Sequence, residues 1–325
     1  MYDTPAPIAA PFAAPLTAPS IARCAADLRW LLQSPPLLSL SPQRFSAAVQ
    51  VFDAAQAQAI QAWLNRLDVA HLHAFVAQGM PAKAPMRLGR YAERLMEYFL
   101  REAQVFELVV ANVPLRRDIR AGDVQHTTVG EFDYLIRDAA GQPWHWELAV
   151  KFYLCHTTGL PLVPHDFKGP AGKDTLGLKL AKVFDKQLRH LPPAPYDTTS
   201  WQPAAYARGW MFYPHNEAVP ACDALNPLHL KGWWLGIEGF LTAQWASAYF
   251  VHLPRLQWLA PCLGSDLAVM SHTQMHGYLQ DYWRTADAKQ AQAGQMLACV
   301  VSTDSGWQEI SRGFVLPHGD AGAVT

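Results

Sequence analysis

The spacing of apolar side chains divides the chain into a helical first part and a strand-rich remainder. Residues 88–103 repeat apolar positions every three or four residues, as one face of a helix does: Leu88, Tyr91, Leu95 and Phe99. Residues 42–67 are rich in Ala and Gln, which favour helix, and carry a weaker stripe of the same kind. We therefore predict a helical region over residues 21–84 and a strongly amphipathic helix at 88–103.

Strand-like segments follow this helix. Residues 105–116 are rich in Val and Leu, and two further apolar segments within 129–155 flank the turn-forming residues 138–143. This pattern predicts one strand and then a β-hairpin that closes at Ala140 and Gly141. Short aromatic strands are expected within residues 205–214, 229–240, 246–260 and 295–316, and a helix near 272–294.

Residues 168–191 contain a Gly/Pro loop and then an amphipathic helix, expected over 174–190. Six of their side chains are basic and two are acidic, so this is the most basic stretch of a chain whose net charge is −1. A protein that coats nucleic acid is usually basic overall. Any contact with nucleic acid must therefore come from a local patch such as this one.

Composition narrows the class of protein. The chain has 325 residues, 50% of them hydrophobic, which is enough for one large domain or two smaller ones. Its five cysteines are scattered without a CxxC pair, as expected for reduced thiols in the cytoplasm. Residues 1–20, rich in Ala and Pro, are expected to form a disordered tail. The most apolar later segment, 232–251, is interrupted by Glu238 and Gln244, so we predict no membrane span.

Acidic and basic side chains share faces of the predicted hairpin. Alternate residues of a strand point to the same side, so Glu131 lies with Asp133, and Glu147 lies with Lys151. Closure at the predicted turn would bring Asp133 within a few residues of the position opposite Glu147. Two carboxylates can hold a hard divalent cation, and a nearby lysine can orient water and steady negative charge. The pattern predicts a metal-dependent phosphodiesterase site.

The segments GEFDYLIRD and HWELAVKFYL resemble the signature of PD-(D/E)XK nucleases, in which an acid, a second acid and a lysine follow one another. Gly89 and Glu93 resemble the helix glutamate motif of that superfamily. Over residues 25–317 the chain is also similar to a bacterial family of unknown function within the same nuclease-like superfamily.

This resemblance implies an αβββαβ core at about 85–215, a central mixed sheet flanked by helices, and a Mg²⁺ or Mn²⁺ cofactor. It implies that Asp133 and Glu147 bind the metal, that Lys151 is the catalytic lysine and that Glu93 is a supporting acid. Nucleic acid would be the substrate. The basic helix would face it with Lys179, Lys182 and Gln187.

The sequence departs from the family pattern at one position. The second acid normally stands two residues before the lysine, where this chain has Ala149, and Glu147 stands four residues before it. The acid keeps its face but is displaced by about 6.6 Å along the strand. A displaced acid can still reach a metal, or the site can have lost its activity.

Other interpretations of the same residues remain open. Glu147 and Lys151 could form a surface ion pair, and Glu93 could belong to a solvated helix face with neighbouring arginines. The basic helix could be a solvated face as well. A zinc site is disfavoured because no histidines stand at ligand spacing, and the many tryptophans suit a core better than a base-stacking platform.

We therefore expect an α/β protein with four parts: the tail (1–20), a helical N-terminal region (21–84), the nuclease-like core (85–215) and an aromatic, β-rich C-terminal extension (216–325). The leading functional hypothesis is a Mg²⁺- or Mn²⁺-dependent nuclease acting on DNA or RNA. The alternatives are a catalytically inactive nuclease fold that binds nucleic acid or protein, and a structural protein whose acids and lysines form a satisfied polar network.

Overall fold

A computed structural model of the chain describes residues 19–41, 45–81, 85–118, 126–157, 161–172, 174–287 and 292–317. The predicted tail lies outside these ranges except for its last two residues, of which Ser20 caps the first helix. The helices are α1 (Ile21–Gln33), α2 (Ala54–Leu64), α3 (Val69–Gln78), α4 (Leu88–Glu102), α5 (Leu176–Asp185), α6 (Ile237–Thr242) and α7 (His272–Thr285), with short 3₁₀ turns η1 (Pro164–Asp166), η2 (Gln187–Arg189) and η3 (Arg255–Gln257).

Twelve described strands form one mixed sheet. Its main path runs β10-β8-β11-β12-β7-β6-β4-β3-β2, and β1, β5 and β9 pair at its sides. The strands are β1 (Ala48–Val49), β2 (Glu107–Asp118), β3 (His126–Arg137), β4 (Pro143–Cys155), β5 (Phe167–Lys168), β6 (Gln202–Pro214), β7 (Leu230–Gly236), β8 (Tyr249–His252), β9 (Leu263–Gly264), β10 (Val269–Ser271), β11 (Gln295–Thr303) and β12 (Gly306–Leu316). The central strands β4, β6, β7 and β12 run parallel to one another, and β4 and β12 are antiparallel to their outer neighbours β3 and β11.

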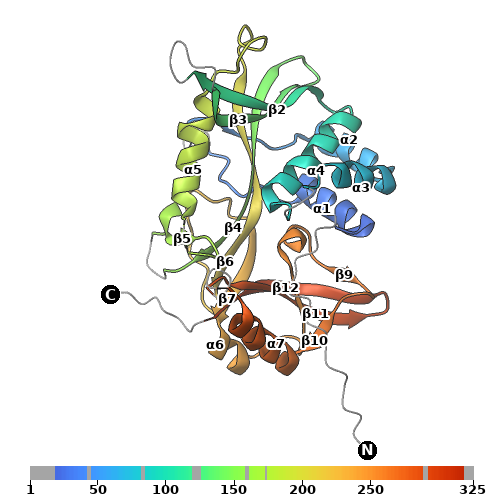
Figure 1. Cartoon of the computed structure of the whole chain (residues 1–325), viewed down its shortest axis with the longest axis vertical. Helices are drawn as coiled ribbons and strands as arrows, with labels where there is room; N and C mark the ends of the chain where they lie inside the picture. Colours follow the sequence, from blue (N-terminus) through green and yellow to red (C-terminus); the bar gives the residue numbers. More distant parts are fainter. Residues whose placement is uncertain are drawn as a thin grey trace, which may run out of the picture.

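Helices cover the sheet on both sides. Figure 1 shows α5 on one side of the long strands and α1 to α4 on the other. Alternation along β4 explains this arrangement: Trp146 and Leu154 belong to the core under the N-terminal helices, whereas Ala149 and Tyr153 belong to the core under α5. A third cluster lies under α6 and α7. The mixed α/β class and the sheet flanked by helices are confirmed.

The predicted helix at 88–103 is α4, and its apolar stripe is its buried face. Tyr91, Leu95 and Phe99 are fully buried. Other positions of the helix carry arginines and glutamates, including the half-buried Glu93. Burial of the stripe therefore decides which charged side chains of α4 remain available for a site.

The predicted hairpin is confirmed as β3 and β4, joined through residues 138–142 with Gly141 at φ 77°. The basic helix is shorter than expected. It ends at Asp185, because Lys186 leaves the helical region at φ −123° and ψ −68°, and the turn η2 follows. This early end places Gln187 on a turn instead of a helix.

A buried charge network joins α1 and α4 to the loop before β9. Asp27 is fully buried and accepts hydrogen bonds from Arg23 Nη2 at 2.6 Å, from the Tyr91 hydroxyl at 2.9 Å and from the Ala260 main chain at 2.9 Å. Arg23 also donates to the Ala260 carbonyl. A carboxylate held in this way by three separate segments ties the helical region to the C-terminal part of the chain.

None of the five cysteines, all of which lie in the described ranges, forms a disulfide. Across those same ranges, the helices are too short or too polar to cross a lipid bilayer.

Replacement of Asp27 by Ala should lower the free energy of unfolding by about 3–5 kcal/mol, because Arg23 would remain buried without its counterion. Urea denaturation followed by circular dichroism measures this loss. Asp281→Ala is the matched control, since Asp281 forms an exposed pair with Arg284 and its removal should cost less than about 0.5 kcal/mol. Equal losses in the two variants would contradict the role assigned to Asp27.

Candidate functional site

Asp133 lies where β3 leaves β4. The two strands pair from Arg137↔Pro143 to Tyr134↔Trp146, and their pairing stops there. Beyond that point Asp133 Oδ2 accepts a hydrogen bond from the main-chain N–H of Leu148 at 2.8 Å. The carboxylate thus takes the place of a main-chain acceptor at the fork between the strands. Its other oxygen, Oδ1, has no hydrogen-bond partner among the described residues.

Glu147 is held beside Asp133 by both of its oxygens. Oε1 is hydrogen-bonded to His145 Nε2 at 2.9 Å, and Oε2 accepts from Gln187 Nε2 at 2.5 Å. Burial lowers the pKa of His145 to about 4, so its ring is neutral near pH 7 and the contact is a hydrogen bond and not an ion pair. Glu147 itself is 2% exposed.

Burial and mutual repulsion perturb the two acids. Burial raises the pKa of Asp133 well above its usual range, and the charges of Glu147 and Glu93 raise it further. Burial also raises the pKa of Glu147 to about 8, against the opposing effects of the Asp133 main chain and Lys182. Carboxyl groups that are buried close together favour binding of a cation or a proton, because either reduces their mutual repulsion.

Lys151 lies on the same face of β4 as Glu147, as predicted. Burial lowers its pKa to about 8, and the charge of Lys179 adds to this effect, while Asp133 opposes it. Within the described part of the chain its ammonium group forms no ion pair or hydrogen bond. The surface ion pair with Glu147, one alternative interpretation of these residues, is therefore not present.

The backbone around Lys151 depends on a glycine in the next strand. Lys151 is paired with Gly209 of β6, and a Cβ added at Gly209 would lie 1.9 Å from the Lys151 carbonyl oxygen. Any larger residue would push the two strands apart at this position. Gly209 thus helps to place the lysine against the sheet.

Glu93 reaches the site from α4 on the other side of the fork. Arg90 Nη1 donates to Glu93 at 2.7 Å, and Arg90 Nη2 donates to Glu131 at 2.5 Å. Burial raises the pKa of Glu93, Arg90 lowers it, and the charges of Glu131 and Lys151 also act on it. Glu93 is therefore both a member of the acidic cluster and a partner of Arg90.

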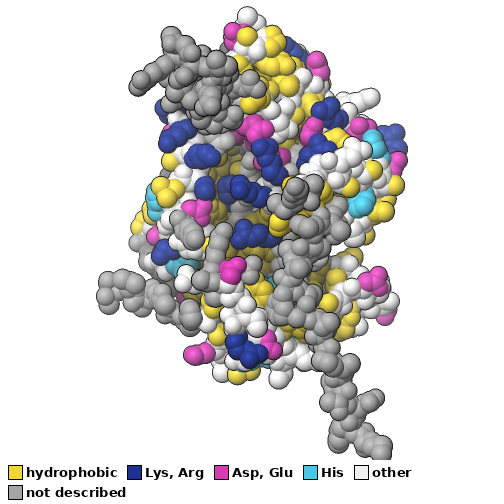
Figure 2. All heavy atoms as spheres, in the orientation of Figure 1, with side chains coloured by type: hydrophobic (Ala, Val, Ile, Leu, Met, Phe, Trp, Pro, Cys, Tyr) yellow, Lys and Arg dark blue, Asp and Glu magenta, His cyan; other side chains and the backbone are white. Residues whose placement is uncertain are grey.

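The basic helix lies along the opposite wall. Lys179 pairs with Asp174 at 2.9 Å, whereas the exposed Lys182 has no ion-pair partner in the described ranges. Gln187 was expected to face substrate, but it binds Glu147. Figure 2 shows Lys and Arg side chains gathered on this face, over α5 and across the hollow between α5 and α4. A protein of nearly zero net charge thus presents one locally basic face beside its buried acids.

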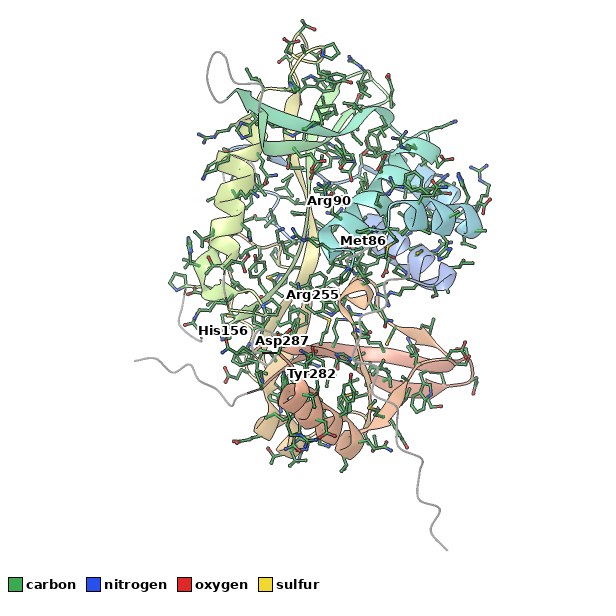
Figure 3. All side chains as sticks on the ribbon, viewed as in Figure 1. Met86, Arg90, His156, Arg255, Tyr282 and Asp287 are labelled. Carbon is green, nitrogen blue, oxygen red and sulfur yellow. The ribbon has the colours of Figure 1, made fainter. Side chains whose placement is uncertain are left out.

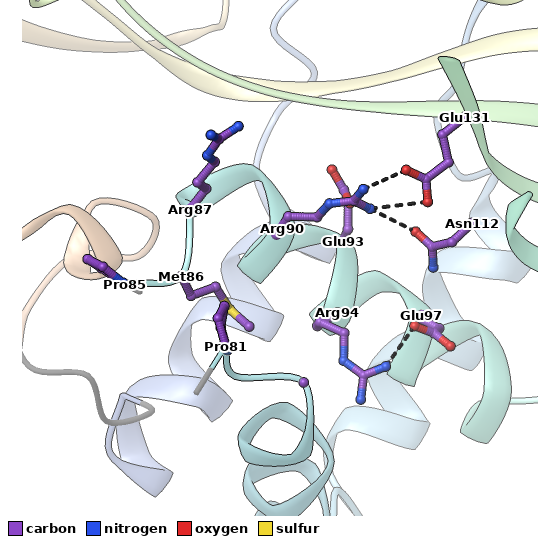
Figure 4. A pocket seen from close by; sticks show the side chains of 11 residues that line it. Pro81, Pro85, Met86, Arg87, Arg90, Glu93, Arg94, Glu97, Asn112 and Glu131 are labelled. Carbon is purple, nitrogen blue, oxygen red and sulfur yellow. Dashed lines mark hydrogen bonds and ion pairs between the residues drawn. The ribbon is translucent and has the colours of Figure 1, made fainter. Parts of the chain in front are cut away.

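A cavity of about 500 Å³ adjoins the acidic cluster on the α4 side. Glu93 is one of its lining residues, together with Gly79, Pro81, Pro85, Met86, Arg87, Arg90, Arg94, Glu97, Asn112 and Glu131. Figure 3 places Met86 and Arg90 in the middle of the molecule, on the α4 side of the long strands. In Figure 4, Asn112 and Glu131 extend toward Arg90 from the strand side.

Asp133, Glu147, Lys151 and Glu93 thus interact through their charges, and the charges of Lys179 and Lys182 also act on members of this set. Neither the apolar spacing nor the motifs of the sequence single out Arg90 or Asn112 as site residues. Asn112 carries one local signal, a polar residue inside an apolar strand segment, but its contact with α4 joins segments far apart in the chain. Over the described residues, no three His, Cys, Asp or Glu side chains converge as a ready-made set of metal ligands.

The comparison with protein families gives a single result. The family described as "Domain of unknown function (DUF1853)" matches residues 26–316. The chain therefore belongs to this family. Neither a curated protein nor a solved structure matches it.

Replacement of Glu147 by Gln should change how stability depends on pH in buffer without divalent cations. The folded-state pKa of about 8 lies above the usual 4.5, so the wild type loses stability as pH rises through this window. The neutral amide keeps the shape without this loss. The free energy of unfolding of the variant minus that of wild type should therefore increase by at least about 1 kcal/mol from about pH 5 to about pH 9. One pKa unit corresponds to about 1.4 kcal/mol. Urea denaturation of both proteins at the two pH values measures this change. The same stability difference at both pH values would contradict the raised pKa of Glu147.

Proposed function

We propose that the protein is a metal-dependent phosphodiesterase of the PD-(D/E)XK type that cleaves nucleic acid. The observation that carries this proposal is the adjacency of Asp133 and Glu147 at the fork between β3 and β4, with Lys151 on the face of β4 that carries Glu147. Apart from the two-residue strand β5 between β4 and α5, the order α4, β2, β3, β4, α5, β6, with β4 and β6 parallel, agrees with the αβββαβ core that the sequence resemblance implies.

The donor set suits Mg²⁺ or Mn²⁺ because it consists of carboxylate oxygens. Asp133 and Glu147 would hold the ion, and the free Oδ1 of Asp133 is the available ligand atom. Magnesium is often bound by one or two carboxylates with water and substrate phosphate completing its shell, so a third protein ligand is not required. When bound, such an ion polarises a phosphoryl oxygen and acidifies water.

The remaining residues have separate roles in this proposal. His145 and Gln187 fix the orientation of the Glu147 carboxyl group through one hydrogen bond each. Lys151, with its lowered pKa of about 8, exists partly as the free amine near neutral pH. The amine can take a proton from water, and the ammonium form can steady negative charge on phosphate. Lys182 on α5 supports binding of the phosphate backbone.

A catalytically inactive nucleic-acid binding protein is the second candidate. One observation favours it: both oxygens of Glu147 are already engaged by His145 and Gln187, and Ala149 stands where the second acid usually lies. The basic face would still bind the phosphate backbone in this case. Binding without cleavage would distinguish this candidate from the enzyme.

A nuclease assay tests the enzyme directly. Wild-type protein should cleave single- or double-stranded DNA or RNA with Mg²⁺ or Mn²⁺, and Asp133→Asn or Lys151→Met should reduce the rate by about 10²-fold or more. Lys231→Met, in an exposed position on β7, is the matched control and should cleave at the wild-type rate. Equal cleavage by all preparations would indicate a contaminant and would end the enzyme proposal.

Metal binding has a readout independent of cleavage. Mg²⁺ or Mn²⁺ should raise the melting temperature more at about pH 9 than at about pH 6, because Asp133 and Glu147, whose pKa values are raised, must lose their protons to bind the ion. Differential scanning fluorimetry measures the shift. Asp133→Asn should remove it, whereas Asp281→Asn, far from the site on α7, should retain it. A shift of equal size in Asp133→Asn would argue against this metal site.

A further inference from the structure

The cavity beside the acidic cluster has a mixed lining that the proposed cleavage reaction does not use. Three of its lining residues are arginines and three are glutamates, so their formal charges cancel. Such a cavity does not suit a polyphosphate. Its volume of about 500 Å³ lies in the range of sites that hold small organic molecules.

The apolar part of the cavity comes from the segment that leads into α4. Met86 is buried at 5% exposure, and Pro81 and Pro85 stand at the rim with exposed side chains. Methionine sulfur makes favourable contacts with aromatic rings, and the exposed Pro81 and Pro85 add apolar surface. This side of the cavity fits the face of a planar ring.

The polar part comes from the strands. Asn112 has a left-handed backbone, φ 56°, inside β2, which is uncommon for a residue other than glycine. Its Oδ1 accepts a hydrogen bond from Arg90 Nη1 at 3.2 Å, and its amide nitrogen has no partner among the described residues. In Figure 4 the Asn112 side chain extends toward Arg90, so a free hydrogen-bond donor stands beside the cavity.

The cavity and the acids occupy neighbouring positions of the same strands. The pairs Ala111↔Tyr134 and Val113↔Phe132 flank Asn112 and Asp133, which therefore stand opposite each other. Glu93 lines the cavity and also influences the pKa of Asp133. A base bound in the cavity would thus place the phosphate of its nucleotide close to Asp133. The exposed Arg87, which has no ion-pair partner in the described ranges, stands at the rim.

We propose that the cavity receives one unpaired nucleotide of the substrate, with its base against Met86 and its edge facing Asn112. This inference rests on the proposed function and specifies its substrate class. A base can enter the cavity only when it is not stacked in a duplex. The substrate is therefore a single strand or a duplex with a frayed or extruded nucleotide, and a regular closed duplex is a poor one.

Ligand-observed NMR with the four nucleoside 5′-monophosphates tests the cavity without cleavage. Wild type should bind at least one of them, and Asn112→Gly should weaken that binding by about fivefold, the effect of one lost hydrogen bond. Glycine is chosen because it adopts the left-handed backbone without strain. Arg87→Gln, a second variant on an exposed side chain, should also weaken binding, and Lys231→Met should not. The proposal would be overturned if wild type did not bind any of the nucleotides. It would also be overturned if both cavity variants bound as tightly as wild type.

Two further measurements separate this proposal from the function on which it rests. Asp133→Asn should still bind the mononucleotide, because the cavity does not include Asp133, even though its nuclease activity is lost. A single-stranded octanucleotide should compete with the mononucleotide at least tenfold better than a hairpin duplex with closed ends. Mononucleotide binding without any nuclease activity would support the cavity and contradict the enzyme. Cleavage with equal competition by both oligonucleotides would support the enzyme and contradict the cavity.

Discussion

The candidate site depends on the point where β3 separates from β4 and the Asp133 side chain replaces a main-chain hydrogen-bond acceptor. Regular pairing of β3 with β4 ends at Tyr134↔Trp146, and beyond it Asp133 accepts the Leu148 N–H. Because an unpaired main-chain N–H inside a protein is costly, this carboxylate is needed for the strands to separate there. The fork also brings Glu147 beside Asp133, with their pKa values raised by burial. The same contact therefore stabilises the local fold and creates the candidate site.

The surroundings of the fork divide into a basic wall and a mixed cavity. Lysines of α5 stand on one side of the sheet, and Arg90 links Glu93 with Glu131 on the α4 side. The two walls come from helices that pack on opposite faces of the sheet, and the separation of β3 from β4 lets both influence the same acids. A chain of nearly zero net charge thus presents a locally basic face without being basic as a whole.

Different buried charges stabilise the fold and form the candidate site. Asp27 has an arginine partner and two further donors, and it joins segments that are distant in the sequence. Asp133 and Glu147 have no basic partner in the described ranges, apart from the neutral ring of His145. A buried acid with a full set of donors is a structural element. Asp133 and Glu147 instead repel each other, and buried acids with raised pKa values are typical of functional sites.

The order of the acids and the lysine along the strands can be predicted from the sequence, whereas the helix expected within residues 42–67 begins only at Ala54, after the short strand β1. Strict spacing located α4 and the hairpin, and strand alternation placed Glu131 with Asp133 and Glu147 with Lys151. Three-dimensional packing sets the contacts of Glu147 with His145 and Gln187, the bridge of Arg90 between two acids, and the position of Asn112 beside a cavity. Periodicity reports which face of one element is buried. It contains no information on contacts between distant segments, which depend on packing and on backbone departures such as the early end of α5.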